Sequence, residues 1–208
     1  PEFVIGMPDK LAASAGLDVL THAIEAYTSV MESNMADGQA MEAIRLVFKY
    51  LRDSVNHGPN FLKAREKMHY AATMAGMAFA NAFLGVCHSL AHSLGSTFHI
   101  AHGLANALML IEYNGTDQPT KQGMLPQYKY PWVKGRYARI ADMLHLADDL
   151  EGDSPEIRGQ KMARLVVAIE QLKKDCHIPT SIREAGVSES DFLAKLDVMA
   201  EHAFDDQC

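Results

Sequence analysis

The sequence predicts an all-α fold, and three observations carry that prediction. Apolar side chains recur at intervals of three and four residues through most of the chain, which is the spacing of one face of an α-helix. Serine, proline and glycine stand at the ends of these segments, where helices begin and stop. No segment is typical of a strand except the short apolar run Phe3-Val4-Ile5, where we expect the tail of a strand. The 208 residues are enough for one helical domain, 1–208.

Three long helices are expected in the first half of the chain. Each is rich in apolar residues at helical spacing, such as Leu17, Leu20 and Ile24 in the first. Their expected ranges are residues 10–31, 37–56 and 61–84. The centre of the third, residues 71–80, is small and methionine-rich on all sides, which predicts a helix buried all round.

Shorter helices are expected in the second half. Ser154 and Pro155 are typical of a helix start, and Ser188 with Asp191 forms a variant of the capping box. Residues 114–132 contain several Asn-Gly and X-Pro steps, which predict an irregular surface loop. The expected helices cover residues 88–97, 102–113, 133–146, a segment from 154 that stops before Pro179, and a last segment from 188.

Composition excludes several classes of function. Lys and Arg number 19 against 26 Asp and Glu, and the resulting net charge of −7 argues against binding to nucleic acid. The three cysteines, Cys87, Cys176 and Cys208, are widely and unevenly spaced, which indicates a reducing compartment and a cytoplasmic protein. No apolar run reaches about 18 residues and no basic segment precedes one at the start, so we expect neither a membrane span nor a signal peptide.

Histidine spacing is the strongest chemical signal in the chain. Asp18 and His22 are four residues apart, so on a helix they lie on one face, beside apolar residues. His88 and His92 repeat this spacing, and His102 opens the following helix. One such pair is often a surface pair, but two pairs in apolar helices would bury several polar rings without partners unless they share a cation. One carboxylate with several imidazoles suits Fe(II) or Zn(II), and the spacing does not choose between them.

Other polar residues near these positions have structural interpretations. Glu25 lies three positions after His22, and we expect it to be a structural partner and not a ligand. Cys87 precedes His88 but points about 100° away on a helix, which indicates a small buried side chain. Five further histidines are interpreted as solvated or capping groups: His57, His69, His145, His177 and His202.

Two motifs resemble the signatures of the iron-dependent alcohol dehydrogenase family. Residues 16–27 read GLDVLTHAIEAY and fit the pattern G-x-D-x-x-x-H-A-x-E-x-Y. Residues 88–95 and 102–107 read HSLAHSLG and HGLANA, and they fit H-x-x-x-H-x-L-G followed by H-G-x-x-N-A. Residues 80–88, 127–131 and 182–186 resemble the alcohol dehydrogenase half of bifunctional aldehyde–alcohol dehydrogenases, so the resemblance covers essentially the whole chain.

The resemblance implies roles for individual residues. In that family one Asp and three His hold a divalent iron, and the matching ligands here are Asp18, His22, His88 and His102. His92 is the second histidine of the H-x-x-x-H motif, which implies contact with the nicotinamide of NAD(H) and a part in proton relay. His99 falls where relatives tolerate other residues, and no role is implied for it.

The resemblance is to the helical metal-binding domain of a dehydroquinate synthase-like fold. The family's N-terminal α/β domain carries a Gly-rich turn that grips the dinucleotide, and residues 1–208 contain nothing that corresponds to it. We therefore expect a C-terminal domain truncated at both ends, without the family's final helix.

The implied function is the reversible reduction of acetaldehyde or another short aldehyde to its alcohol, with Fe(II) and NAD(H). The partners implied are the small substrate and further copies of the protein, since the bifunctional relatives form filaments. One alternative is a non-catalytic metal-binding and oligomerisation module. A weaker alternative is a helical phosphohydrolase, which would require a His-Asp dipeptide that the sequence lacks.

Overall fold

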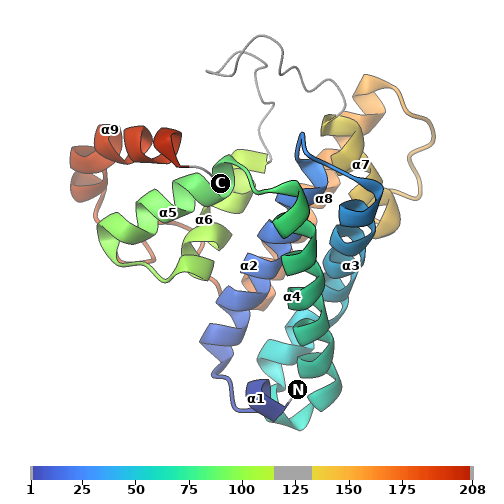
Figure 1. Cartoon of the computed structure of the whole chain (residues 1–208), viewed down its shortest axis with the longest axis horizontal. Helices are drawn as coiled ribbons and strands as arrows, with labels where there is room; N and C mark the ends of the chain where they lie inside the picture. Colours follow the sequence, from blue (N-terminus) through green and yellow to red (C-terminus); the bar gives the residue numbers. More distant parts are fainter. Residues whose placement is uncertain (1, 115–132, 207–208) are drawn as a thin grey trace.

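A computed structural model describes residues 2–114 and 133–206, and every regular element in these ranges is helical (Figure 1). This confirms the all-α prediction. The elements are α1 (Glu2–Ile5), α2 (Asp9–Thr28), α3 (Asn34–Asn56), the 3-10 helix η1 (Gly58–Asn60), α4 (Leu62–Ala82), α5 (Val86–Phe98), α6 (His102–Asn114), α7 (Val133–Met143), α8 (Pro155–Asp175) and α9 (Glu189–Asp205).

The helix starts in the second half follow the local signals in the sequence. The Ser154 hydroxyl accepts a hydrogen bond from the Ile157 backbone N–H at 3.3 Å, and Pro155 begins α8. The Ser188 hydroxyl accepts from the Asp191 N–H at 3.1 Å at the start of α9. Both serines satisfy backbone donors that the first helical turn leaves unpaired, as predicted.

The prediction of a strand at residues 3–5 is wrong, because these residues belong to α1. Phe3 is fully exposed, and no strand exists in 2–114 or 133–206 with which an extended segment could pair. Extended backbone groups would have no ladder to join, whereas a helical turn pairs some of them locally. The Met7 N–H, for example, donates to the Val4 carbonyl at 3.3 Å.

Helix α4 is buried on one face and not all round, so that prediction is also wrong. Ala71, Ala75 and Ala78 are buried on the side of α4 that packs against α2 and α3. Tyr70 and Met77 are 40% and 46% exposed on other sides of the helix. Small residues let α4 approach its neighbours closely, but only one face finds such neighbours within the described part of the chain.

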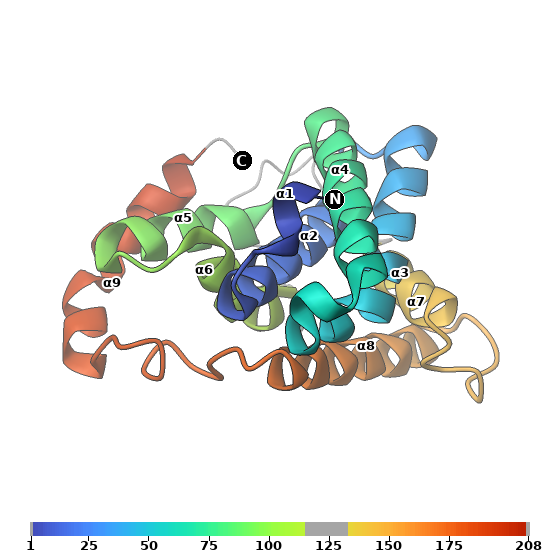
Figure 2. The ribbon, with the colours of Figure 1, turned by 90° about the horizontal axis from the view of Figure 1, so that it is seen from below.

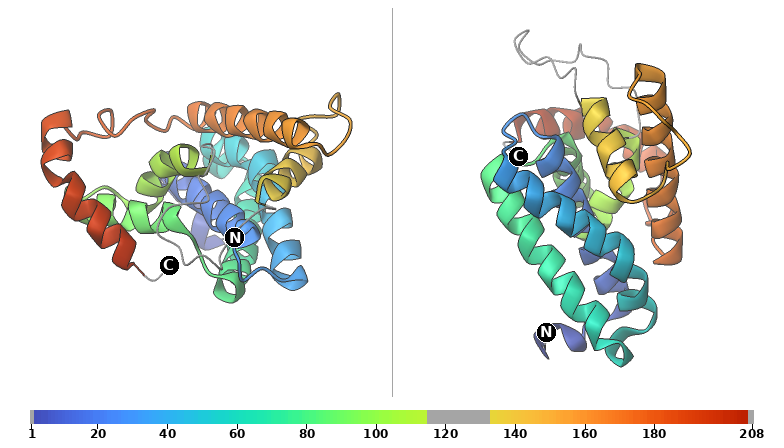
Figure 3. Two further views of the ribbon diagram at one scale, coloured as in Figure 1. Left: turned by 90° about the horizontal axis from the view of Figure 1, so that it is seen from above. Right: turned by 90° about the vertical axis from the view of Figure 1, so that its right-hand side faces the viewer.

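Helix α2 runs through the middle of the molecule. It packs with α3 and α4 on one side and with α6 on the other (Figures 1 and 2). Helices α5 and α6 pack against each other, and α9 lies along α5 at the edge of the molecule (Figure 3). Helix α8 packs mainly against α7 and also touches α3 and α6. The middle of α2 and the first turns of α5 and α6, which carry the candidate ligands, therefore meet near the centre of the molecule.

A buried arginine joins α7 to the first two long helices. Arg136 hydrogen-bonds to the Tyr27 carbonyl oxygen and to the carboxylates of Glu32 and Asp37. Its guanidinium also lies 4.0 Å from the centre of the Tyr27 ring. A buried guanidinium requires such partners, because an uncompensated charge in the interior costs several kcal/mol.

No single helix in the described ranges is long and apolar enough to cross a membrane. Helices α4 and α5 taken together have the length and the apolar composition of a membrane span, but their axes are bent by 109° relative to each other. The surface loop expected at residues 114–132 lies outside the described residues, except for Asn114 at the end of α6.

Candidate metal centre

Helix α2 supplies the first two candidate ligands. Asp18 and His22 lie one turn apart on the same face of α2, and their side chains are 18% and 17% exposed. The distance from His22 Nδ1 to Asp18 Oδ2 is 3.9 Å. The His22 ring stacks on Phe79 of α4 with ring centroids 4.6 Å apart, so packing fixes its plane.

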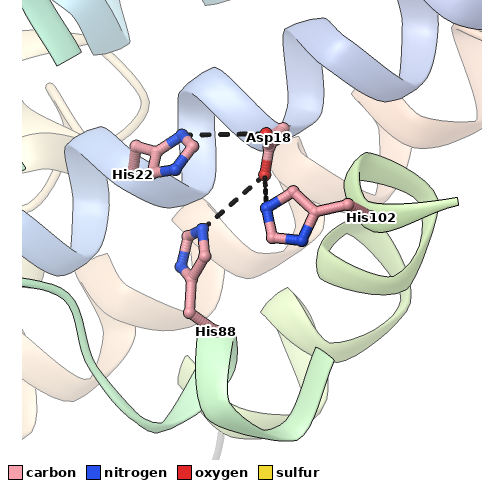
Figure 4. A group of neighbouring side chains, drawn as sticks. All are labelled: Asp18, His22, His88 and His102. Atoms are coloured by element: carbon pink, nitrogen blue, oxygen red, sulfur yellow. Dashed lines mark ion pairs between the residues drawn. The ribbon is translucent and has the colours of Figure 1, made fainter. Parts of the chain in front are cut away.

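His88 and His102 approach Asp18 from two other helices. His88 lies in the first turn of α5, and its Nε2 is 3.6 Å from Asp18 Oδ1. His102 is the first residue of α6, and its Nε2 is 3.4 Å from the same oxygen. One ligand atom from each of the four side chains lies within 4.8 Å of the others, and Figure 4 shows them pointing toward a common centre.

A buried carboxylate, that of Glu25, holds His88 in place. Its Nδ1 forms a short hydrogen bond with Glu25 Oε2, and the other carboxylate oxygen of Glu25 accepts the Cys87 backbone N–H at 2.8 Å. Glu25 is thus a structural partner, as predicted. Cys87 is completely buried, and burial raises the pKa of its thiol well above the ordinary value. This agrees with its interpretation as a small buried side chain.

Asn106 belongs to the site and was not identified from the sequence. Its Nδ2 donates to Asp18 Oδ1 at 2.7 Å and lies 3.1 Å from His102 Nε2. Asn106 follows His102 by one helical turn and falls in the H-G-x-x-N-A motif, so that spacing was the available signal.

Burial and the neighbouring charges shift the pKa values of the residues in this site. Burial lowers the pKa of His22 to about 4, despite the nearby carboxylate of Asp18. Burial likewise lowers the pKa of His102. Burial alone would lower the pKa of His88, but the carboxylates of Asp18 and Glu25 outweigh it and raise that pKa to about 9. His22 and His102 are therefore neutral near pH 7, the form in which imidazole binds metals. His88 is protonated near pH 7, so a metal ion that binds there would displace the proton from its Nε2.

The residues fit a divalent cation. His88 Nε2 is buried and has no hydrogen-bond partner among the residues that the structure describes, although it faces Asp18 Oδ1. An unpaired buried nitrogen is costly, and a shared cation would satisfy it together with the other three donors. One carboxylate and three imidazoles are ligands that suit Fe(II) and Zn(II).

The structure places His92 beside this cluster. It lies one turn after His88 on α5, and its ring centroid is 5.1 Å from that of His102 and 5.9 Å from that of His88. Its side chain is 40% exposed, so His92 lies at the open side of the site. The other histidines are exposed and lie outside the cluster: His57, His69, His99, His145, His177 and His202. His99 ends α5 in the left-handed conformation.

Comparison with known proteins identifies the family. The model of the "Fe-containing alcohol dehydrogenase family, C-terminal" matches residues 12–208. The chain is 53% identical over 208 residues to the bifunctional aldehyde-alcohol dehydrogenase AdhE of Escherichia coli (strain K12), covering 99% of this chain and 23% of that protein. It is 50% identical over 210 residues to the aldehyde-alcohol dehydrogenase of Clostridium acetobutylicum, covering 100% of this chain and 24% of the relative. The chain therefore spans about a quarter of the length of these relatives.

Solved structures share the fold. The crystal structure of a 1,3-propanediol oxidoreductase matches with a TM-score of 0.80 at 38% identity, over 98% of this chain and 47% of that one. An iron-containing alcohol dehydrogenase from Thermococcus thioreducens matches with a TM-score of 0.76 at 33% identity, over 98% and 46%. These matches agree in fold with the helices that bring the four side chains together. The chain belongs to the Fe-containing alcohol dehydrogenase family and corresponds to its helical C-terminal domain.

Proposed function

We propose that Asp18, His22, His88 and His102 bind one divalent iron ion, with zinc as the alternative, in the active site of an alcohol dehydrogenase. The observation that carries the proposal is the convergence of four donor atoms within 4.8 Å around a buried, unpaired His88 Nε2. The reaction is the reversible reduction of acetaldehyde or a similar short aldehyde with NAD(H).

Each side chain has a distinct part in this proposal. A divalent ion would act as a Lewis acid toward the oxygen of the alcohol or aldehyde. Asp18 contributes the negative charge, and Asn106 holds that carboxylate in position. His88 is fixed from behind by Glu25, so its Nε2 faces the other ligands. His102 is 46% exposed, which leaves the site open on the side from which a small substrate would enter.

We assign the proton relay and the nicotinamide contact to His92. Its position beside His102, at the open side of the cluster, suits a group that exchanges protons with a substrate near the metal. The nicotinamide cofactor would supply or accept the hydride. Most of its binding surface would belong to residues outside this chain, because 1–208 contains no Gly-rich phosphate loop.

The names of the relatives support a small alcohol or aldehyde as the substrate. They include an NADPH-dependent butanol dehydrogenase from Clostridium saccharobutylicum, 40% identical over 97% of this chain and 46% of its own, and the 1,3-propanediol oxidoreductase. We also propose that the protein works in the cytoplasm as a homo-oligomer, with filaments as one form of assembly.

Elemental analysis of protein purified without oxygen tests the metal site. We expect close to one iron or zinc per chain in the parent protein and strongly reduced metal in Asp18→Ala and His88→Ala, because each change removes one of four ligands. His69→Ala is the matched control, since His69 is exposed on α4 and should leave the metal content unchanged. Full metal content in both ligand variants would contradict the assignment.

A second variant separates catalysis from metal binding. His92→Ala should keep its metal and lose turnover by about 100-fold or more, the range for a general acid–base group. Unchanged turnover would reject the role of His92. Metal binding without any dehydrogenase activity in the full-length protein would instead favour the non-catalytic binding and oligomerisation module.

A further inference from the structure

A carboxylate near the end of the described chain reaches the candidate relay histidine. The distance from His92 Nδ1 to Asp206 Oδ2 is 2.8 Å, a direct hydrogen bond between residues that are 114 positions apart. The Asp206 side chain is 23% exposed and that of His92 is 40% exposed, so the pair is partly shielded from water. The neighbouring Asp205 is exposed.

Helix α9 brings Asp206 to this position. Asp206 is the residue that caps the C-terminal end of α9, and α9 packs chiefly against α5, the helix that carries His92 (Figures 2 and 3). The Ser93 hydroxyl on α5 donates to the Met199 carbonyl on α9 at 2.7 Å. Met199 belongs to a buried apolar cluster that includes Leu94 of α5, and Ala203 is also buried. The packing of α9 on α5 thus sets the place of the Asp206 carboxylate.

The chemistry of the pair follows from the imidazole ring. A carboxylate that accepts a hydrogen bond from Nδ1–H keeps the proton on that nitrogen and restricts rotation of the ring. The proton that the ring gains or loses is then the one on Nε2, and Nδ1–H stays bonded to the carboxylate in both states. This is how an aspartate orients the histidine of a hydrolase triad.

We propose that Asp206 is a positioning residue for the dehydrogenase: it holds His92 in the Nδ1–H form and aims Nε2 at the substrate side of the site. The inference rests on the proposed function, in which His92 relays the proton. It assigns to α9 a part in the active site that no residue of its sequence indicates.

Kinetics of the full-length protein test this role. Asp206→Asn should lower kcat by about tenfold or more, with KM and metal content nearly unchanged. Asp206→Glu should recover part of the loss, because it keeps the carboxylate. Asp205→Asn is the matched control, since it removes the same charge one residue away on an exposed side chain. In a His92→Ala background, Asp206→Asn should cause no further loss.

A spectroscopic measurement tests the pair without reference to activity. In ¹⁵N-histidine-labelled, zinc-loaded protein, the His92 signals, identified by their loss in His92→Ala, should show Nδ1 protonated. Asp206→Asn should reduce that population, and Asp205→Asn should not. These ¹⁵N signals test the positioning role of Asp206 even if the protein has no dehydrogenase activity. In that case the proposed function would be rejected while the effect of Asp206 on His92 could still be measured.

Two results would overturn the inference. One is a spectrum in which the His92 tautomer does not respond to Asp206→Asn. The other is an equal loss of kcat from Asp206→Asn in the parent and His92→Ala proteins, which would mean that Asp206 acts on stability or metal content and not through His92.

Discussion

Glu25 shows how one buried side chain organises a ligand. Its two carboxylate oxygens accept two different donors, the Cys87 backbone N–H and the Nδ1 of His88. Gly85 lies close by, and a Cβ there would come within 2.8 Å of Glu25 Oε1. The turn before α5 is therefore shaped around this carboxylate, which fixes the direction of the His88 ring.

We predict that Glu25→Gln weakens metal binding by about 10- to 100-fold. A glutamine keeps the size of the side chain but replaces one carboxylate oxygen with an NH2 group, so one of the two donors that Glu25 now accepts would face another donor. Competition with a chelator measures the change in affinity. Glu170→Gln serves as the control, because Glu170 is exposed on α8. Equal affinity in the parent protein and Glu25→Gln would show that His88 does not need this partner.

The position of α6 depends on a close approach to α2. Gly103 is the second residue of α6, directly after the candidate ligand His102. A Cβ on Gly103 would lie 2.5 Å from the Ser14 carbonyl oxygen on α2, a backbone atom that cannot move aside. Only glycine allows the two helices to pack this closely, and the same contact brings His102 to Asp18.

Gly103→Ala should therefore push α6 away from α2. We expect a loss of about 1–3 kcal/mol in the free energy of unfolding, as for other overpacked sites, together with weaker metal binding. Gly159→Ala is the matched control, because Gly159 lies within α8 with no atom within 4 Å of its added Cβ. That variant should gain about 0.5–1 kcal/mol from helix propensity. Urea unfolding measures the free energy of unfolding of both variants and of the parent protein. A Gly103→Ala variant as stable as the parent would refute the close-packing argument.

The candidate site forms where two apolar clusters meet. The larger cluster contains α2, α3, α4 and much of α8, and the smaller one joins α5, α6 and α9 around Leu94, Leu108 and Met199.

The larger cluster also buries two thiols, Cys87 and Cys176. Burial raises the pKa of Cys176 to about 12. The folded molecule thus keeps this thiol protonated under conditions in which the unfolded chain ionises it.

This difference predicts a pH effect on stability. The pKa of Cys176 is higher in the folded protein than in the unfolded chain. The thiol's contribution to the free energy of unfolding is therefore fully present below about pH 9 and is lost as pH rises toward 12. At pH 10.5 the loss should be about 2 kcal/mol relative to pH 8. Urea unfolding of the parent protein and Cys176→Ala at both pH values measures it, since the variant lacks this contribution. An equal loss in the free energy of unfolding between the two pH values in the parent protein and in Cys176→Ala would contradict the prediction.

Local patterns in the sequence were enough to predict most helices and the residue types of the candidate site. Helical spacing places Asp18 and His22 on one face, and Ser154 and Ser188 mark helix starts, because these effects act within a turn or two of the chain. The family motifs added His88 and His102 to the same set. Each of these signals depends on residues that are close in sequence.

Contacts between distant segments required the folded structure. The turn at α1 and the single buried face of α4 depend on which neighbours each segment meets. Asp206 approaches His92 from 114 residues away, and no periodicity or motif in the sequence relates the two. The physical reason is that helix propensity and amphipathicity are local, whereas the meeting of side chains from α2, α5, α6 and α9 results from packing over the whole molecule.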